Sequence, residues 1–311
     1  MQADHKPLVS INHLSKRFGK VCAVDDVSLT IQPNEVVALL GENGAGKTTT
    51  IGSLLGQLKA DSGEVIVFGH PAGHWAAKQQ MGVMLQSAAL PDNVKVIEQL
   101  RLFASYYPNS LSLEDALEKA LLTDLQQRKV QTLSGGQKQR LLFAMAIIGN
   151  PRLVILDEPT VGLDATARRE FWRCIRALAA RGASVLLTTH YLEEADALSD
   201  RIIVLSKGRV IAQGVPEQIK AELGGKRLRF RSNTSHEVVQ KLLPDTKVHS
   251  RGDYIEVYST APQTHLMALF DADITTLDLT VSGISLEDAF LHLTQSTVST
   301  NSAVNNQEIS S

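Results

Sequence analysis

The sequence has no long apolar run and almost no net charge, and each of these absences excludes a class of protein. No uninterrupted apolar run among the 311 residues approaches the ~20 residues that a membrane-spanning helix needs, so we expect no bilayer-crossing segment. The formal net charge of −2 lacks the basic excess with which proteins neutralise nucleic-acid phosphates. Met1–Pro7 contains charged residues but no apolar core, so we expect no signal peptide there.

Cysteine is also scarce, which argues against a disulfide framework. The two cysteines, Cys22 and Cys174, stand in unrelated contexts, and neither has a His or Cys at metal-ligand spacing. We therefore predict two reduced, structural thiols. The hydrophobic content of 43% over this length predicts one large globular domain plus a smaller one, or two domains.

A glycine-rich loop stands between a predicted strand and a predicted helix. The strand is expected at 35–40 and the helix at 48–58, and the loop between them fits the phosphate-binding pattern G-x-x-x-x-G-K-[ST]. Its glycines let successive N–H groups point inward, and the helix N-terminus adds partial positive charge. Lys47 can then reach the β- and γ-phosphates, and the Thr48 hydroxyl can ligate Mg²⁺. The loop residues are Gly41, Glu42, Asn43, Gly44, Ala45, Gly46, Lys47 and Thr48.

A second apolar strand, expected at 153–156, delivers two acids at its carboxyl end. Asp157 would hold Mg²⁺ through water, and Glu158 is placed to polarise an attacking water. Together with the phosphate loop, these acids predict a nucleoside triphosphate site.

Two further polar residues follow predicted strands. Gln86 comes after 82–85 and His190 after 184–188, which places both on the ligand edge of a parallel sheet. Each has a structural alternative, because Gln86 could be a solvated loop amide and His190 a packing residue. The spacing alone leaves both alternatives open.

The first 31 residues predict two strands, at 8–18 and 24–31, with a bend between them at Asp25-Asp26. Phe18 ends the first strand and could be a core aromatic. From about 88 to 150 the pattern becomes helical. Within this stretch Leu133-Ser134-Gly135-Gly136-Gln137 reads as a turn that leads into a helix.

The C-terminal part has a different pattern. Residues 224–295 predict the order β-α-β-β-α-β, which is typical of a small ferredoxin-like domain, followed by a helix with a Ser285/Asp288 cap. The basic strand Lys226–Arg231 reads either as a binding patch or as a solvated strand face. Residues 296–311 are rich in Ser, Thr and Asn and predict a disordered tail.

Taken in this order, the motifs resemble those of the ATP-binding subunits of ABC transporters. The Leu-Ser-Gly-Gly-Gln segment before an acidic strand end is the specific element, since phosphate loops occur in many NTPases. The resemblance runs from about residue 8 to 223. It implies an α/β P-loop NTPase core at 1–223 with an antiparallel β subdomain and a helical subdomain at about 88–150.

The resemblance also assigns roles to site residues. Phe18 matches the aromatic that stacks on adenine, although the family more often has Tyr there. The loop from Gly41 and the following Thr49 match the ATP-binding residues, while Thr48, Gln86 and Asp157 match the Mg²⁺ site. Glu158 matches the general base, and His190 matches the switch histidine that contacts the γ-phosphate.

In this family the signature segment completes the site of a second copy packed head to tail. Ser134, Gly135, Gly136 and Gln137, with Asp164 in the following loop, would thus act in trans. The chain has one phosphate loop and one signature, so the resemblance implies a homodimer or a paired nucleotide-binding subunit.

Two segments narrow the resemblance to the group that pairs with ABC-2-type permeases: Thr188–Asp196 and Ser285–Phe290. This implies ATP hydrolysis that drives a separate membrane permease for export, at the cytoplasmic face of the membrane. The alternatives are a soluble regulatory or DNA-processing ATPase of the same superfamily and a module that senses ATP without hydrolysing it. The absence of long heptad repeats and the presence of Glu158 and His190 weigh against them.

Overall fold

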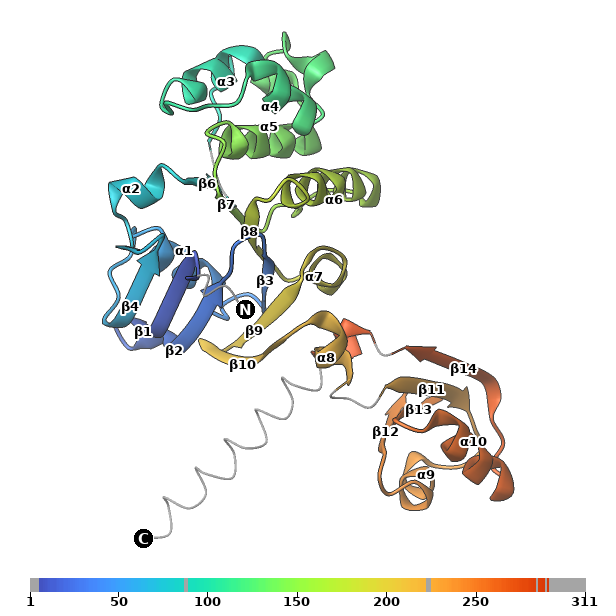
Figure 1. Ribbon diagram of the computed structural model, residues 1–311. Coiled ribbons are helices and arrows are strands. Elements are labelled where there is room, and N and C mark those ends of the chain that lie inside the picture. Colours follow the sequence, from blue (N-terminus) through green and yellow to red (C-terminus); the bar gives the residue numbers. More distant parts are fainter. Residues whose placement is uncertain (1–5, 87–88, 222–224, 284, 289, 291–311) are drawn as a thin grey trace, which may run out of the picture. The chain divides into compact units, whose positions relative to one another are not determined.

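The computed structural model describes residues 6–86, 89–221, 225–283, 285–288 and 290. The chain forms two compact units, one ending at Gln213 and the other beginning at Gly214 (Figure 1). The sequence-based domain boundary, at residue 223, stands slightly further along. The expected tail at 296–311 lies outside the described residues.

The first unit is built on a six-stranded sheet in the order β10-β9-β3-β8-β7-β6. The five neighbouring strands β9, β3, β8, β7 and β6 run parallel to one another. All five residues of β3 and of β7 are buried, which explains why these strands are nearly continuous apolar runs. The strands are β3 (Val36–Leu40), β6 (Met81–Met84), β7 (Leu153–Asp157), β8 (Ser184–Thr189), β9 (Arg201–Ser206) and β10 (Arg209–Gly214).

A four-stranded antiparallel sheet, in the order β2-β1-β4-β5, shares its core with helix α1 and the parallel sheet. Asp25 and Asp26 lie inside β2, so the expected bend between the first two strands is wrong. The chain reverses at Gly19-Lys20 instead, and Asp26, with φ +56°, marks a bulge. The strands are β1 (Val9–Phe18), β2 (Val21–Ile31), β4 (Ser62–Val67) and β5 (His70–Pro71).

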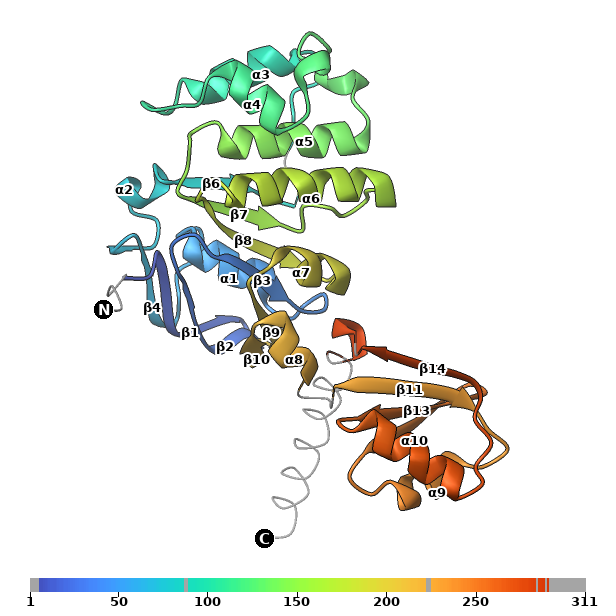
Figure 2. The ribbon, with the colours of Figure 1, turned by 45° about the vertical axis from the view of Figure 1, so that its right-hand side comes forward.

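Helices α3, α4 and α5 pack on one another as a helical subdomain (Figure 2). Helix α5 begins with a capping box, in which Ser134 accepts from the Gln137 N–H and the Gln137 side chain accepts from the Ser134 N–H. The helices of this unit are α1 (Lys47–Leu54), α2 (Trp75–Lys78), α3 (Val96–Ala104), α4 (Leu113–Lys119), α5 (Gly135–Ile147), α6 (Ala165–Ala179) and α7 (Leu192–Leu198). Short 3₁₀ turns span Thr123–Leu125 and Val130–Thr132.

The second unit confirms the ferredoxin-like prediction. Its sheet has the order β12-β13-β11-β14 with every pair antiparallel. Leu228, Phe230 and Val257 form its core with α9 and α10. Its elements are α8 (Pro216–Ala221), β11 (Lys226–Arg231), α9 (His236–Leu242), β12 (Lys247–Arg251), β13 (Tyr254–Ser259), α10 (Pro262–Asp271) and β14 (Leu277–Gly283).

The basic strand β11 uses its arginines inside its own unit. Arg227 donates to Asp288 at 2.9 Å, and Arg229 lies over the Tyr254 ring. Ser285 accepts from the Asp288 N–H and donates its hydroxyl to the Asp288 carboxylate, which is the cap that the sequence predicts. The charge of β11 is therefore largely matched by acids and aromatic rings of the same unit.

The two fold-level predictions, a P-loop core with two subdomains and a small α+β domain, are confirmed. Both cysteines are free thiols. Across the described ranges, no helix combines the length and the apolarity that a bilayer crossing requires.

Candidate functional site

The phosphate loop is shaped by close contact with β2. Gly46 is the N-cap of α1 and has φ +106°, a conformation that a side chain disfavours. A Cβ atom there would also lie 2.6 Å from the carbonyl oxygen of Ala23. Only glycine satisfies both conditions, so this loop depends on a contact that the local motif does not reveal.

Lys47 is buried at the start of α1. Its Nζ donates to the carbonyl oxygens of Gly41 at 2.6 Å and Glu42 at 3.2 Å. The same nitrogen lies 3.3 Å from Glu158 Oε1. The lysine is thus held over the loop with its charge directed at the acid.

Three predicted residues converge on the Glu158 carboxylate. Besides Lys47, Gln86 Nε2 donates to Glu158 Oε2 at 3.1 Å. His190 Nδ1 lies 3.5 Å from the same oxygen without a hydrogen bond to the described residues. These residues follow β6, β7 and β8 or begin α1, so the carboxyl edge of the sheet gathers them.

The backbone of Glu158 is in a strained conformation that β8 holds in place. Its φ is +49°, which is uncommon for a residue with a side chain. Its N–H donates to the Thr188 carbonyl at 3.2 Å and to the Thr188 hydroxyl at 2.9 Å. Strain of this kind is worth roughly 1–3 kcal/mol and persists only where the surroundings fix it.

The Thr188 hydroxyl also donates to Asp157. Burial raises the pKa of Asp157, and the neighbouring Glu158 charge adds to this effect. The Thr188 hydrogen bond and Lys47 lower that pKa in turn. Thr188 was not predicted as a site residue, although it is the direct partner of Asp157 in the parallel β7–β8 register.

Most of the predicted ATP-binding residues line one cavity of about 560 Å³. Gly41 and Ala45 belong to the same loop without lining the cavity, and Asp157 is buried next to Glu158 in the chain and does not line it either. Four lining residues were not predicted: Val21, Cys22 and Ala23 of β2, and Val161. The predicted residues in the lining are Glu42, Asn43, Gly44, Gly46, Lys47, Thr48, Thr49, Gln86, Glu158 and His190.

Phe18 stands at the rim of this cavity. It pairs across the hairpin with Val21, which lines the cavity, and its side chain is 49% exposed. Lys16 Nζ lies 5.6 Å from its ring centroid. The alternative that Phe18 is a core aromatic is therefore wrong.

The residues predicted to act in trans form a separate cluster. Gly136 lies against Leu163 and Ala167, so that a Cβ on it would come within 3.6 Å and 3.4 Å of their side chains. Asp164 caps α6 through the N–H groups of Thr166 and Ala167. None of Ser134–Gln137 or Asp164 is among the residues that line the 560 Å³ cavity.

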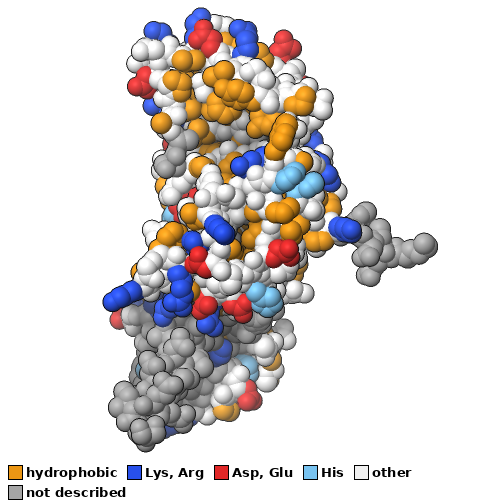
Figure 3. Space-filling view, turned by 90° about the vertical axis from the view of Figure 1, so that its left-hand side faces the viewer, with side chains coloured by type: hydrophobic (Ala, Val, Ile, Leu, Met, Phe, Trp, Pro, Cys, Tyr) orange, Lys and Arg blue, Asp and Glu red, His pale blue; other side chains and the backbone are white. Residues whose placement is uncertain are grey.

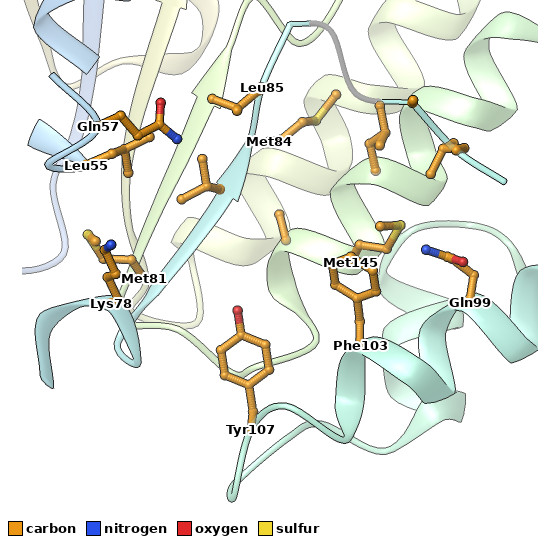
Figure 4. Close-up of a pocket in the computed structure, with 15 residues that line it drawn as sticks. Leu55, Gln57, Lys78, Met81, Met84, Leu85, Gln99, Phe103, Tyr107 and Met145 are labelled. Carbon is orange, nitrogen blue, oxygen red and sulfur yellow. The ribbon is translucent and has the colours of Figure 1, made fainter. Parts of the chain in front are cut away.

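A second cavity, a groove of about 450 Å³, lies between β6 and the helical subdomain (Figure 4). Met81, Met84 and Leu85 line one side, and Phe103 and Met145 the other. Met145 belongs to α5 of the helical subdomain. Hydrophobic side chains gather over the upper part of the face shown in Figure 3.

Leu85 lines this groove, and the next residue, Gln86, lines the nucleotide cavity. The two cavities are therefore joined by consecutive residues at the end of β6. Gln86, one peptide bond from Leu85, donates through its side chain to the Glu158 carboxylate.

Comparisons with known proteins agree with this geometry. The family model "ABC transporter" matches residues 24–161. A daunorubicin resistance ATP-binding protein, DrrA3, from Streptomyces coeruleorubidus is 36% identical over 92% of this chain and 95% of its own length. A Nod factor export ATP-binding protein I from Burkholderia lata is 42% identical over 70% of this chain and 74% of its length.

Solved structures give the same result. An ATP-binding subunit of an ABC transporter superposes with a TM-score of 0.63 at 29% identity, over 69% of this chain and 92% of that one. The ADP conformation of an ATP-binding cassette superposes with a TM-score of 0.60 at 26% identity, over 68% and 92%. The chain belongs to the ATP-binding proteins of ABC transporters and is an ATPase.

Proposed function

We propose that two copies of this chain hydrolyse ATP with Mg²⁺ and drive a separate ABC-2-type membrane permease that exports its substrate. The working place is the cytoplasmic face of the plasma membrane, reached through the permease. The convergence of Lys47, Gln86 and His190 on Glu158 carries this proposal, because it brings phosphate-binding and water-activating groups into one cavity.

The residues of the cavity divide the chemistry between them. The loop N–H groups and Lys47 hold the phosphates, and Phe18 at the rim stacks on the adenine. Glu158 takes the proton of the attacking water, and His190 contacts the γ-phosphate. The chemistry needs little beyond this positioning and the charge stabilisation of the γ-phosphoryl group.

The donor set also fits Mg²⁺, which prefers oxygen ligands. The Thr48 hydroxyl, the Gln86 amide oxygen and the Asp157 carboxylate would hold it. Asp157 fits the role of a ligand, since it is 2% exposed and, among the residues that the structure describes, only the Thr188 hydroxyl donates to its carboxylate. When bound, the ion supplies charge neutralisation for the phosphate oxygens.

The cluster of Ser134–Gln137 and Asp164 supports a homodimer. These residues lie apart from the cavity of their own chain, at the exposed start of α5 and the cap of α6. In a head-to-tail pair with twofold symmetry each copy would offer this cluster to the phosphates of the other.

The groove beside β6 supports a membrane partner, and we assign it to a helix of the permease. It is apolar and large enough to seat side chains of a helix. Its occupant would act on Gln86 through Leu85. The relatives whose names include export or drug resistance favour outward transport.

The competing function is a soluble ABC-family ATPase with a regulatory role. A membrane partner distinguishes the two. Membranes that contain the cognate permease should retain the purified protein and change its ATPase rate. A regulatory ATPase would not bind to these membranes, and its rate would stay the same. Met145→Glu in the groove should abolish the retention without loss of ATP binding.

The hydrolytic assignment is tested with Glu158→Gln, which keeps the shape and removes the base. We expect ATP binding within about threefold of wild type and turnover lowered by at least about 100-fold, the range that general base catalysis supplies. Hydrolysis of ATP by this variant at the wild-type rate would refute the assignment.

A further inference from the structure

A buried carboxylate behind the site is not used by the chemistry described above. Glu194 lies in the first turn of α7, four residues after His190, and is fully buried. Its neighbour Glu193 is exposed. Because an isolated buried carboxylate is costly, the contacts of Glu194 indicate why the chain keeps it there.

One oxygen of Glu194 accepts two hydrogen bonds from different elements. The Thr160 hydroxyl donates to Oε1 at 2.8 Å, and the Trp172 indole N–H donates to the same atom at 2.9 Å. Thr160 is itself 1% exposed. Glu194 thus joins three parts of the chain: α7, the segment that follows β7, and α6.

The position of these donors is informative. Thr160 stands two residues after Glu158 and begins the turn 160–164, which ends at the α6 cap Asp164. Trp172 lies about two helical turns into α6. Glu194 therefore contacts the start of the 160–164 turn and the helix that follows this turn, and it does so from the helix that follows His190.

A second link runs in parallel. The Arg168 guanidinium of α6 lies over the Tyr191 ring at 4.4 Å, and that ring is 4.2 Å from the ring of His190. Gly136 of the signature lies against Leu163 of the turn and Ala167 of α6. The 160–164 turn thus stands between the residues that serve the chain's own site and those offered to a second copy.

We propose that Glu194 and Thr160 are positioning residues whose hydrogen bond couples the His190 segment to the 160–164 turn. ATP at one site then sets the surface that completes the other site, and the two sites of a dimer act together. This inference rests on the proposed function, because it requires a second copy. A purely structural contact would affect stability but not the response of the dimer to ATP.

The test uses the full chain with Glu158→Gln, in which ATP is bound and retained. Light scattering at saturating ATP gives the protein concentration at which half the chains are dimers. Thr160→Val removes the hydroxyl and should raise this concentration about tenfold or more, while ATP binding by the monomer stays within about threefold. Thr160→Ser keeps the hydroxyl and should restore the midpoint to within about twofold.

Ser199→Ala is the matched control. The Ser199 hydroxyl lies at the C-terminal end of α7 and donates to the carbonyl oxygen of Ala195, a residue of the same helix. Its loss should leave the dimerisation midpoint unchanged. If Thr160→Val fails to fold, Trp172→Phe removes the other donor to the same oxygen and should shift the midpoint in the same direction.

The results distinguish an error in the proposed homodimer from an error in the proposed coupling through Glu194. If the Glu158→Gln protein does not dimerise with ATP, the homodimer of the proposed function is wrong. If it dimerises, and Thr160→Val or Trp172→Phe dimerises at the same concentration, the coupling through Glu194 is wrong while the proposed function stands.

Discussion

Replacing Thr188 with valine should weaken both the fold and the catalysis, because one hydroxyl serves two acids. Valine fills nearly the same space but removes the donor to Asp157 and one acceptor of the Glu158 N–H. The Glu158 N–H keeps the Thr188 carbonyl, 3.2 Å away. The larger loss therefore falls on Asp157, a carboxylate that is 2% exposed.

The magnitude follows from these two bonds. A hydrogen bond to a charged group is worth about 1.5–3 kcal/mol and a neutral one about 0.5–1.5 kcal/mol, so the free energy of unfolding should fall by roughly 2–4.5 kcal/mol. In a unit of this size that corresponds to a decrease in Tm on the order of 5–15 °C. Release of the strained Glu158 backbone should lower kcat at least about tenfold, which corresponds to about 1.4 kcal/mol.

Two measurements check this prediction: thermal unfolding of the ATP-free protein and steady-state phosphate release. Thr188→Ser is the matched control, since it keeps the hydroxyl and should retain most of the stability and the rate. A Thr188→Val protein with wild-type Tm and a kcat within about twofold of wild type would refute the argument.

Three further predictions concern single residues. A thiol reagent should label Cys22, which lines the nucleotide cavity, and the label should block ATP binding, while bound ATP should protect the thiol. Burial raises the pKa of Cys174 to about 11, so mass spectrometry should find this residue unlabelled at pH 7.5. Gly46→Ala should lower ATP affinity by at least about tenfold in titration calorimetry, because its Cβ meets the Ala23 carbonyl. Burial raises the pKa of Glu194, so the protonated form favours folding. The stability of wild type relative to Glu194→Gln should be highest below the pKa that Glu194 has in the unfolded chain, about 4.5, and should fall as pH rises towards the pKa in the folded protein. Denaturant titrations measure the difference in unfolding free energy between the two proteins, and a difference that does not change with pH would contradict this prediction.

The sequence predicted those parts of the site that depend on residues close together in the chain. The phosphate loop is contiguous, and Gln86, Glu158 and His190 each follow an apolar strand that reads clearly as buried. Because parallel strands bring their carboxyl ends to one edge, these separate signals predict a single site. The structure places Gln86 and His190 within hydrogen-bond or ion-pair range of the Glu158 carboxylate.

Features that depend on strand register or on tertiary packing were not predictable. Asp25 and Asp26 suggested a bend because acids often occur in turns, but a bulge accommodates them within β2. Thr188 becomes the partner of Asp157 only through the β7–β8 register. Glu194 stands beside Glu193 at the polar start of a helix, so nothing in the neighbouring sequence indicates that its side chain is buried.

The signature segment is the most direct test of the account. With ATP, the Glu158→Gln protein should have twice the mass of the 33.8 kDa chain by light scattering, and adding Ser134→Arg should return it to the mass of one chain while ATP stays bound. A double variant that forms the dimer as well as Glu158→Gln alone would show that Ser134 does not complete the site of a second copy, and would contradict the account.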